Sequence, residues 1–153
     1  GDESLSETVD RWRNMVYRFD FEFSNPGRLV CTFQDLRPYA GTDYYYISII
    51  HATQTIELYR YTFPAAVLLG SWVNPIGFGT ARWGIMIRSQ IVVGGAALEV
   101  YLDGDLKISV VDVAVDMPAG AIGYEATAAA AANIYRPTVI ILPGTVVKVP
   151  SWL

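Results

Sequence analysis

Cysteine and histidine are almost absent from this sequence of 153 residues, which has one of each, Cys31 and His51. A single cysteine cannot form an internal disulfide, and within the run RLVCTF it is typical of a small buried apolar residue. His51 ends the run YYYISIIH, where we expect a structural role at a strand end. These counts exclude a Cys/His metal cluster, and a nucleophilic site of the Ser-His or Cys-His type would have to use His51.

Charged residues are also scarce. They make up 17% of the chain, against an average of about 25% for soluble proteins. The net charge is -4 and no basic run occurs, which argues against a nucleic-acid partner because phosphate binding needs clustered Lys and Arg. With so little charge, part of the surface is expected to be neutral, aromatic or covered by another molecule.

One long run, residues 61–81, has no charge at all and is long enough to span a membrane. Prolines and glycines interrupt it repeatedly. We therefore predict that residues 61–81 form a strand end and a long loop rather than a transmembrane helix. Residues 1–12 are acidic and polar and lack a signal-peptide pattern. A secreted chain from which the signal peptide has been removed would have the same appearance.

Alternation of apolar and polar residues predicts strands along most of the chain. In YRFDFEF, aromatic residues alternate with Arg18, Asp20 and Glu22, so one face is buried and the other available. In ALEVYLDGDLKISVVDV, residues 97–113, Asp103-Gly104 favours a tight turn between two such runs, which predicts a hairpin.

Further strands are predicted within RLVCTFQD, YYYISIIHA, TIELYRYTF, RWGIMIRSQIVVGG and AIGYEAT, and one or two within NIYRPTVIILPGTVVKVPSWL. SLSETVDRW predicts a short helix, and residues 126–132 a tight segment of small residues. Short strands separated by turns indicate an all-β sandwich or jelly roll. We expect a single domain over residues 1–153, with residues 1–14 as an N-terminal extension and 142–153 as a C-terminal tail.

The order of these elements resembles the concanavalin A-like lectin/glucanase jelly roll, the superfamily of laminin G-like domains and family 16-type glycoside hydrolases. The segments that carry it are YRFDFEF, YYYISI, IELYRY, RWGIMIRSQ, LEVYLDGDLKISVVDV, PAGAIGYEA and ANIYRPTVII. The resemblance implies two antiparallel sheets, with ligands on the concave one. Such domains begin with an extra N-terminal strand that is not recognisable here, and the tail is expected either to replace it or to pair with a neighbouring subunit.

A sugar-binding face is expected on the side of the strands turned away from the core. Aromatic rings stack on the CH faces of sugars, while carboxylates and arginines bond their hydroxyls. The alternative is an ordinary solvated face with ion pairs between strands. The candidate ligand-binding residues are Arg18, Asp20, Glu22, Tyr46, Tyr59, Arg88, Glu99 and Tyr101.

Calcium binding occurs in parts of the resembling superfamily. Asp35 and Asp43 flank the loop LRPYAGT and are candidate calcium ligands. Asp103 and Asp105 also flank a glycine, but the longer Asp-x-Asp-x-Asp-Gly pattern is missing, which favours turn chemistry there.

Family 16-type hydrolases carry a Glu-x-Asp-x-x-Glu-like motif on one strand, and no such motif occurs here. No catalytic residue is therefore assigned. We expect a non-catalytic glycan-binding or adhesion module on an extracellular, cell or virion surface, as a homo-oligomer or within a larger assembly. The first alternative is a structural subunit of a filament, virion or appendage, which low charge and apolar residues 65–81 and 138–153 would suit. The second is a divergent glycoside hydrolase with carboxylates from separate strands.

Overall fold

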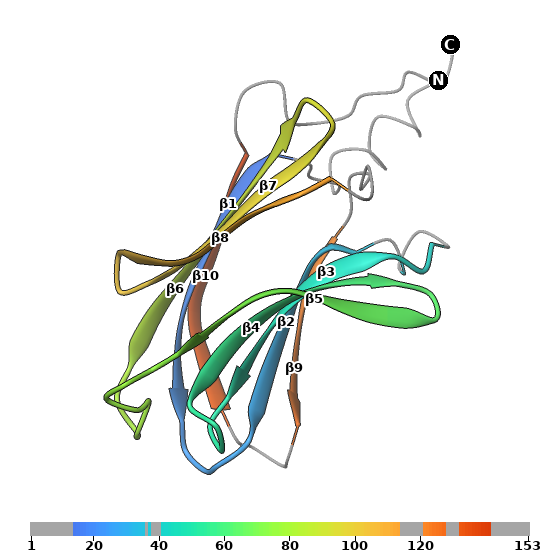
Figure 1. Ribbon diagram of the computed structural model, residues 1–153. Coiled ribbons are helices and arrows are strands. Elements are labelled where there is room, and N and C mark those ends of the chain that lie inside the picture. Colours follow the sequence, from blue (N-terminus) through green and yellow to red (C-terminus); the bar gives the residue numbers. More distant parts are fainter. Residues whose placement is uncertain (1–13, 36, 38–40, 114–120, 128–131, 142–153) are drawn as a thin grey trace, which may run out of the picture.

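The chain folds into two antiparallel sheets that face each other, as the resemblance implied, and each sheet has five strands (Figure 1). The computed structural model describes residues 14–35, 37, 41–113, 121–127 and 132–141. In spatial order, sheet 1 contains β10 (Ala132–Ile141), β1 (Met15–Phe23), β6 (Trp83–Val92), β7 (Gly95–Leu102) and β8 (Asp105–Asp112). Sheet 2 contains β5 (Ala65–Val73), β4 (Thr55–Thr62), β3 (Tyr44–Ile50), β2 (Arg28–Asp35) and β9 (Ala121–Thr127).

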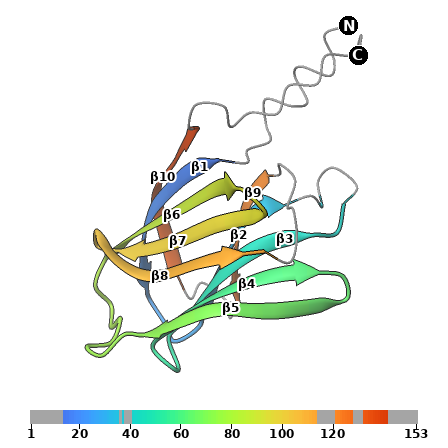
Figure 2. The ribbon, with the colours of Figure 1, turned by 45° about the horizontal axis from the view of Figure 1, so that its top comes forward.

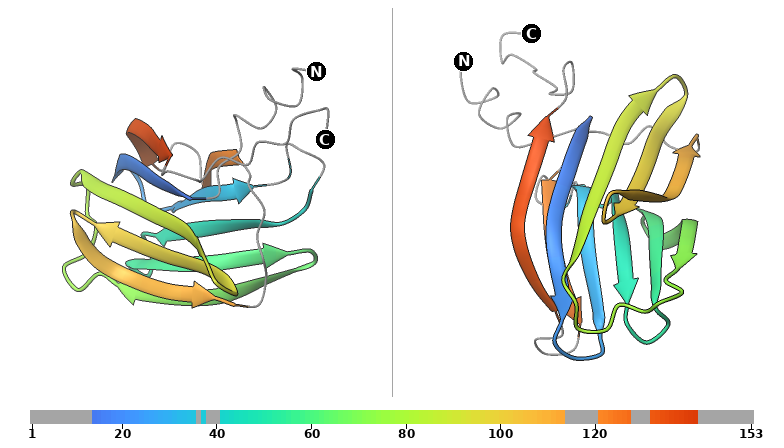
Figure 3. Two further views of the ribbon diagram at one scale, coloured as in Figure 1. Left: turned by 90° about the horizontal axis from the view of Figure 1, so that it is seen from above. Right: turned by 90° about the vertical axis from the view of Figure 1, so that its left-hand side faces the viewer.

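The strands β2 to β5 follow one another as neighbours in sheet 2, and β6 to β8 do so in sheet 1. The chain changes sheet between these blocks, so that β1 joins sheet 1 beside β6 and β10 lies outside β1, while β9 joins sheet 2 beside β2. Figure 3 shows this order across sheet 1 in its right-hand view. The edge strands β5 and β8 lie against each other on one side of the sandwich (Figure 2). The result is an all-β jelly-roll sandwich.

Aromatic side chains from β1 form the middle of the core. Tyr17, Phe19, Phe21 and Phe23 are all buried, and Phe19 meets Tyr124 of the opposite sheet edge-on, with ring centroids 5.3 Å apart. Such edge contacts suit the charge distribution of aromatic rings. The period-two alternation of β1 therefore directs its aromatic residues inward and its charged residues outward, as predicted.

Cys31 and His51 occupy the structural positions expected of them. The Cys31 side chain is fully buried, and burial raises the pKa of its thiol well above the usual value, so the reactive thiolate is disfavoured. The ring of His51 packs edge-on against Phe23, with centroids 5.1 Å apart. The predicted hairpin is also confirmed, since Asp103 and Gly104 have φ angles of 49° and 85° between β7 and β8.

The prediction that residues 61–81 form a strand end and a long loop is wrong for Ala65–Val73, which is strand β5. The run AAVLLGSWV has no polar alternation, because β5 is an edge strand whose apolar side chains are exposed over much of its length. A Phe63-Pro64 turn joins it to β4, with Thr62 paired to Ala65. Of the predicted loop, only the residues between the end of β5 at Val73 and the start of β6 at Trp83 are loop.

Some predictions concern residues outside the described ranges. These are the helix in residues 4–12, the tail 142–153 with its pairing, and the middle of the small-residue segment, 128–131. In the described part, that segment ends β9 and begins β10. No helix among the described residues is long and apolar enough to cross a membrane.

A buried ion pair joins the two sheets at one end of the sandwich. Arg60 of β4 donates from Nη1 to Oδ1 of Asp112 on β8 over 2.6 Å, and their side chains are only 11% and 3% exposed. Tyr45 of β3 donates its hydroxyl to the other carboxylate oxygen of Asp112 over 2.9 Å. Because both charges are removed from water, the loss of either partner would leave an uncompensated buried charge.

We predict that Asp112→Ala lowers the free energy of unfolding by about 3–5 kcal/mol, since it leaves Arg60 buried without its carboxylate. Urea denaturation followed by circular dichroism measures the change. The matched control is the double variant Arg60→Met with Asp112→Leu, which leaves no unpaired charge and should lose much less stability. Equal losses in the single and double variants would show that the charge pair is not the cause.

Candidate functional site

The candidate sugar-binding residues do not form one surface, because the structure divides them between the two outer faces of the sandwich. Tyr46 and Tyr59 pair across β3 and β4 and lie on the outer face of sheet 2. The others lie on the outer face of sheet 1: Arg18, Asp20, Glu22, Arg88, Glu99 and Tyr101. Alternation separates inward from outward side chains, but it does not indicate which sheet a strand joins.

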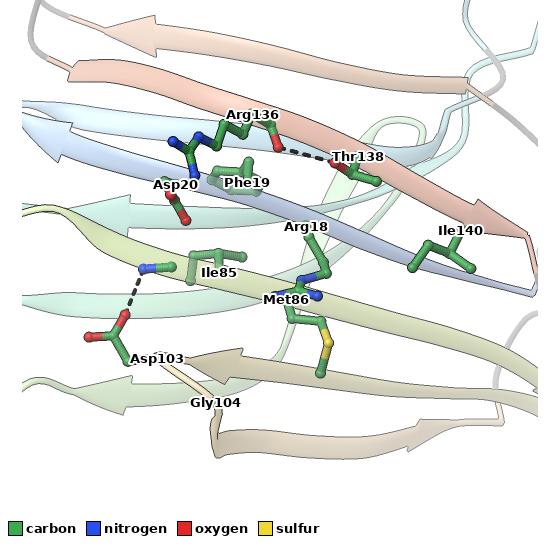
Figure 4. A pocket seen from close by; sticks show the side chains of 11 residues that line it. Arg18, Phe19, Asp20, Ile85, Met86, Asp103, Gly104, Arg136, Thr138 and Ile140 are labelled. Atoms are coloured by element: carbon green, nitrogen blue, oxygen red, sulfur yellow. Dashed lines mark hydrogen bonds between the residues drawn. The ribbon is translucent and has the colours of Figure 1, made fainter.

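The outer face of sheet 1 contains a hollow of about 400 Å³ (Figure 4). This volume lies within the range of about 300–1,000 Å³ that is common for ligand sites. Three neighbouring strands, β10, β1 and β6, and the β7–β8 turn surround it. Its main side chains are Arg18, Asp20, Met86, Asp103, Arg136 and Ile140.

Gly84 forms the floor of this hollow. A Cβ atom at this position would lie 3.3 Å from Oδ1 of Asp20 and 3.5 Å from Oδ1 of Asp103, so any side chain would project between the two carboxylates. The Gly84 amide donates to Oδ1 of Asp103 over 2.7 Å, and its carbonyl accepts from the Asp103 amide over 2.8 Å. These bonds hold the β7–β8 turn against β6. Because Gly84 has no side chain, the space between the two carboxylates stays open.

Arg136 reaches the hollow because β10 contains a bulge. The register of β10 with β1 shifts between Arg18 and Asp20, which gives β10 one extra residue there. Arg136 takes the uncommon φ of 50°, and Figure 4 shows its side chain directed toward Asp20. Bulges often re-aim a side chain beside a functional site, at a cost in backbone strain.

The polar groups of the hollow are available to a ligand. Within the part of the chain that the structure describes, the side chains of Arg18, Asp20 and Arg136 make no hydrogen bond or ion pair. Two arginines with donors and one carboxylate with acceptors thus converge on one space. Met86 and Ile140 add apolar surface beside them.

Other candidates on the same face are engaged with one another. Glu99 faces Arg88 across β6 and β7 at 3.8 Å and accepts a hydrogen bond from the Tyr101 hydroxyl over 3.1 Å. At the far end of β1, Glu22 accepts from the Tyr135 hydroxyl and lies 4.0 Å from Arg82. These contacts match the alternative of ion pairs across a solvated sheet.

The outer face of sheet 2 carries tyrosines whose rings cover one another. Tyr46 and Tyr59 stack with centroids 4.8 Å apart and planes 10° apart, and Tyr44 and Tyr61 stack at 4.9 Å. Arg28 donates from Nε to the Ser48 hydroxyl over 2.5 Å. These aromatic faces and polar groups are directed at one another, so this face offers a ligand less than the hollow does.

The calcium candidates lie at the ends of β2 and β3. Both carboxylate oxygens of Asp35 accept hydrogen bonds from the Arg37 side chain. Burial alone would raise the pKa of Asp35, but its hydrogen bonds and the Arg37 charge outweigh this and hold that pKa below its usual value. Asp43 accepts from the Thr42 hydroxyl over 3.1 Å. Among the described residues no three His, Cys, Asp or Glu side chains cluster as metal ligands, and calcium binding stays a prediction.

The sequence did not identify Arg136, Met86 or Asp103 as site residues. The position of Met86 beside Arg18 follows from alternation once β6 is known to pair with β1. Arg136 depends on the bulge, and the signal that could have found it is Pro137, since proline within a strand indicates an edge or a bulge.

Comparison with known proteins gives matches at the level of structure. No family model matches the sequence, and no curated protein is similar to it. Among solved structures, a carbohydrate-binding module, CBM66, from Bacillus subtilis has a TM-score of 0.68 at 16% identity, covering 83% of this chain and 74% of that one. A Bacillus subtilis protein of unknown function with a galectin-like fold has a TM-score of 0.68 at 13% identity, covering 84% and 72%.

A galectin of Caenorhabditis elegans also matches, with a TM-score of 0.61 at 10% identity over 84% of this chain and 83% of that one. The fold is similar to that of galectins. It is a jelly roll of the concanavalin A-like kind, in line with the resemblance drawn from the sequence. At these identities the galectin-like likeness concerns the fold alone, so any function must be argued from the residues of the hollow.

On sheet 2, the Tyr59 hydroxyl donates to Oε2 of Glu57 over 2.7 Å, and this hydrogen bond, with burial, raises the pKa of Tyr59 to about 12. Ionisation would place a phenolate beside the carboxylate. We predict that Glu57→Gln lowers the pKa of Tyr59 toward about 10, the value of an unperturbed tyrosine.

NMR titration of tyrosine labelled at Cζ measures this pKa. Tyr101, whose hydroxyl bonds Glu99 on sheet 1, serves as an internal control whose raised pKa should be the same in both proteins. An unchanged pKa of Tyr59 in Glu57→Gln would contradict the assigned hydrogen bond.

Proposed function

We propose that this protein is a glycan-binding module that takes a neutral, hydroxyl-rich sugar in the hollow of sheet 1. The observation that carries the proposal is the convergence of Arg18, Asp20 and Arg136 on one space of about 400 Å³, where none of them bonds to another described side chain. Polar side chains on a solvated sheet commonly pair with each other, as Arg88 and Glu99 do nearby. Groups left available in a concave site are suited to a ligand.

The chemistry of the hollow matches a sugar ring. A carboxylate accepts hydrogen bonds from hydroxyl groups, and a guanidinium donates them to hydroxyl and ring oxygens, so Asp20 with either arginine can hold adjacent hydroxyls. Met86 and Ile140 offer apolar contact to the CH groups of the same ring. The hollow pairs two arginines with two aspartates, including Asp103, so its formal charge is balanced and a neutral ligand is favoured over an anion.

The comparisons support this proposal by analogy. The matched structures include one named as a carbohydrate-binding module and several named as galectins. A binding role without catalysis also agrees with the absent Glu-x-Asp-x-x-Glu-like motif. The proposal places the module on an extracellular, cell or virion surface, where it would meet polymeric glycans, within a homo-oligomer or larger assembly.

A glycan array on the purified protein, with and without calcium, tests the function. We predict specific binding that falls about 10- to 100-fold in Arg18→Gln and in Asp20→Asn, because a hydrogen bond to a charged group contributes about 1.5–3 kcal/mol. The matched control is Glu57→Gln on sheet 2, which should bind as the unchanged protein does. Loss of binding in EDTA would support the calcium prediction at Asp35 and Asp43.

Two results would contradict this site. Binding that survives both hollow variants but is lost in Tyr46→Ala would move the site to sheet 2. No binding to any glycan by the folded protein would reject the function itself.

Hydrolysis is a second candidate, because Asp20 and Asp103 lie on either side of Gly84. A glycosidase needs two carboxyl groups across the scissile bond, one of them a general acid whose pKa is raised, commonly by apolar burial. Asp103 is exposed and Asp20 only half-buried, which favours binding over catalysis. Release of reducing sugar from a bound glycan, lost in Asp20→Asn, would reverse this preference.

A structural subunit is the third candidate, favoured by the exposed apolar edge strand β5. Val67, Leu68 and Val73 are 40%, 50% and 61% exposed on a strand without charged residues. Such an edge is a site where strands of other chains can pair. Sedimentation of the full chain tests this candidate, since a monomer at every concentration would count against it.

A further inference from the structure

A second pocket, of about 210 Å³, lies beside the β7–β8 turn, which also lines the hollow. Asp103 lines both spaces, so the two adjoin at this turn. The second pocket contains the indole rings of Trp72 and Trp83, with Asn74, Asp105 and Lys107. Its volume is below the range of about 300–1,000 Å³ for a whole ligand site, so it suits one part of a longer ligand.

The two indoles are held by the fold. Trp83 donates its indole N–H to the Phe78 carbonyl over 2.8 Å and packs edge-on against the Phe78 ring at 5.8 Å. Trp72 is half-buried at the margin of the core, on the edge strand β5. Half-exposed, immobilised aromatic rings provide apolar surface for the CH face of a sugar at little entropic cost.

A bulge in β8 brings Lys107 to this pocket. The register of β8 with β7 shifts so that Leu106 pairs with Tyr101 and Ile108 with Val100, which leaves Lys107 unpaired between them. Its Nζ lies 4.7 Å from the centroid of the Trp72 ring. The same strand presents the exposed carboxylate of Asp105 to the pocket, so that a donor and an acceptor flank the indoles.

Asn74 supplies an independent sign that a polar group belongs here. The residue is only 4% exposed, and its Oδ1 accepts from the Ile76 amide over 3.1 Å. Its Nδ2 is buried and has no hydrogen-bond partner among the described residues. A buried donor without an acceptor is costly, and an oxygen of a ligand seated in the pocket would relieve that cost.

We propose that the bound glycan continues from the hollow, over the Asp103-Gly104 turn, into this indole pocket. The protein would then recognise at least two consecutive sugar residues of an oligosaccharide or polysaccharide. The hollow binds one sugar through Arg18, Asp20 and Arg136, and the pocket binds the next through Trp72, Trp83 and its polar rim. This inference rests on the proposed function and adds the chain length and direction of the ligand.

The test uses a length series of homo-oligosaccharides of glucose, galactose, mannose and fructose, from monosaccharide to hexasaccharide, titrated by calorimetry. We expect affinity to rise about tenfold, equivalent to about 1.4 kcal/mol, once a second sugar is present. In the double variant Asp105→Asn with Lys107→Gln, that gain should fall below about threefold, since each lost hydrogen bond removes part of it.

Controls separate this inference from the function on which it rests. The affinity for the monosaccharide should be unchanged in the double variant and reduced in Arg18→Gln. Glu57→Gln, which removes a carboxylate on the outer face of sheet 2, should leave the whole series unchanged. Circular dichroism checks that each variant is folded, and Trp72→Phe repeats the test with a smaller ring.

The outcomes are distinct. An undiminished gain with chain length in both pocket variants would overturn the second subsite while the hollow stands. An affinity that does not rise beyond the monosaccharide would overturn it as well. Absence of binding at every length in all four series would overturn the glycan site and the subsite together.

Discussion

The aromatic side chains of β1 impose the constraint on which the sandwich depends. Tyr17, Phe19, Phe21 and Phe23 must all lie between the sheets, because exposing rings of this size would be costly. A shift of one residue would reverse every side chain of β1, so burial fixes its register with β6 and β10. That register places Arg18 and Asp20 together on the outer face, where the hollow lies.

The regular alternation of apolar and polar side chains produces the two sheets, and the bulges that interrupt this alternation place side chains at the hollow and the indole pocket. One extra residue in β10 brings Arg136 to the hollow, and one in β8 brings Lys107 to the indole pocket. Both bulges lie in edge strands, where a free side tolerates an unpaired residue. Asp103 of the β7–β8 turn lines both spaces, and its bonds with Gly84 hold this turn against β6.

Period-two patterns were sufficient to predict the fold class, most strands and the buried rings of β1. They failed for Ala65–Val73, whose apolar run has no alternation because it lies at an exposed edge. They also placed Tyr46 with Arg18, since alternation within one strand does not tell which sheet the strand joins. Arg136 was missed because its position depends on a bulge, a property of two paired strands that no single strand reveals.

The proposed function depends on sugar binding by the side chains around the hollow, on the outer face of sheet 1. NMR spectra of arginine side-chain Nε–Hε groups, recorded as a glycan is added, test it most directly. If the sugar binds in the hollow, the signals of Arg18 and Arg136 shift together and saturate at one dissociation constant, while that of Arg28 on sheet 2 stays unchanged. Saturating shifts at Arg28, with Arg18 and Arg136 unmoved, would contradict it.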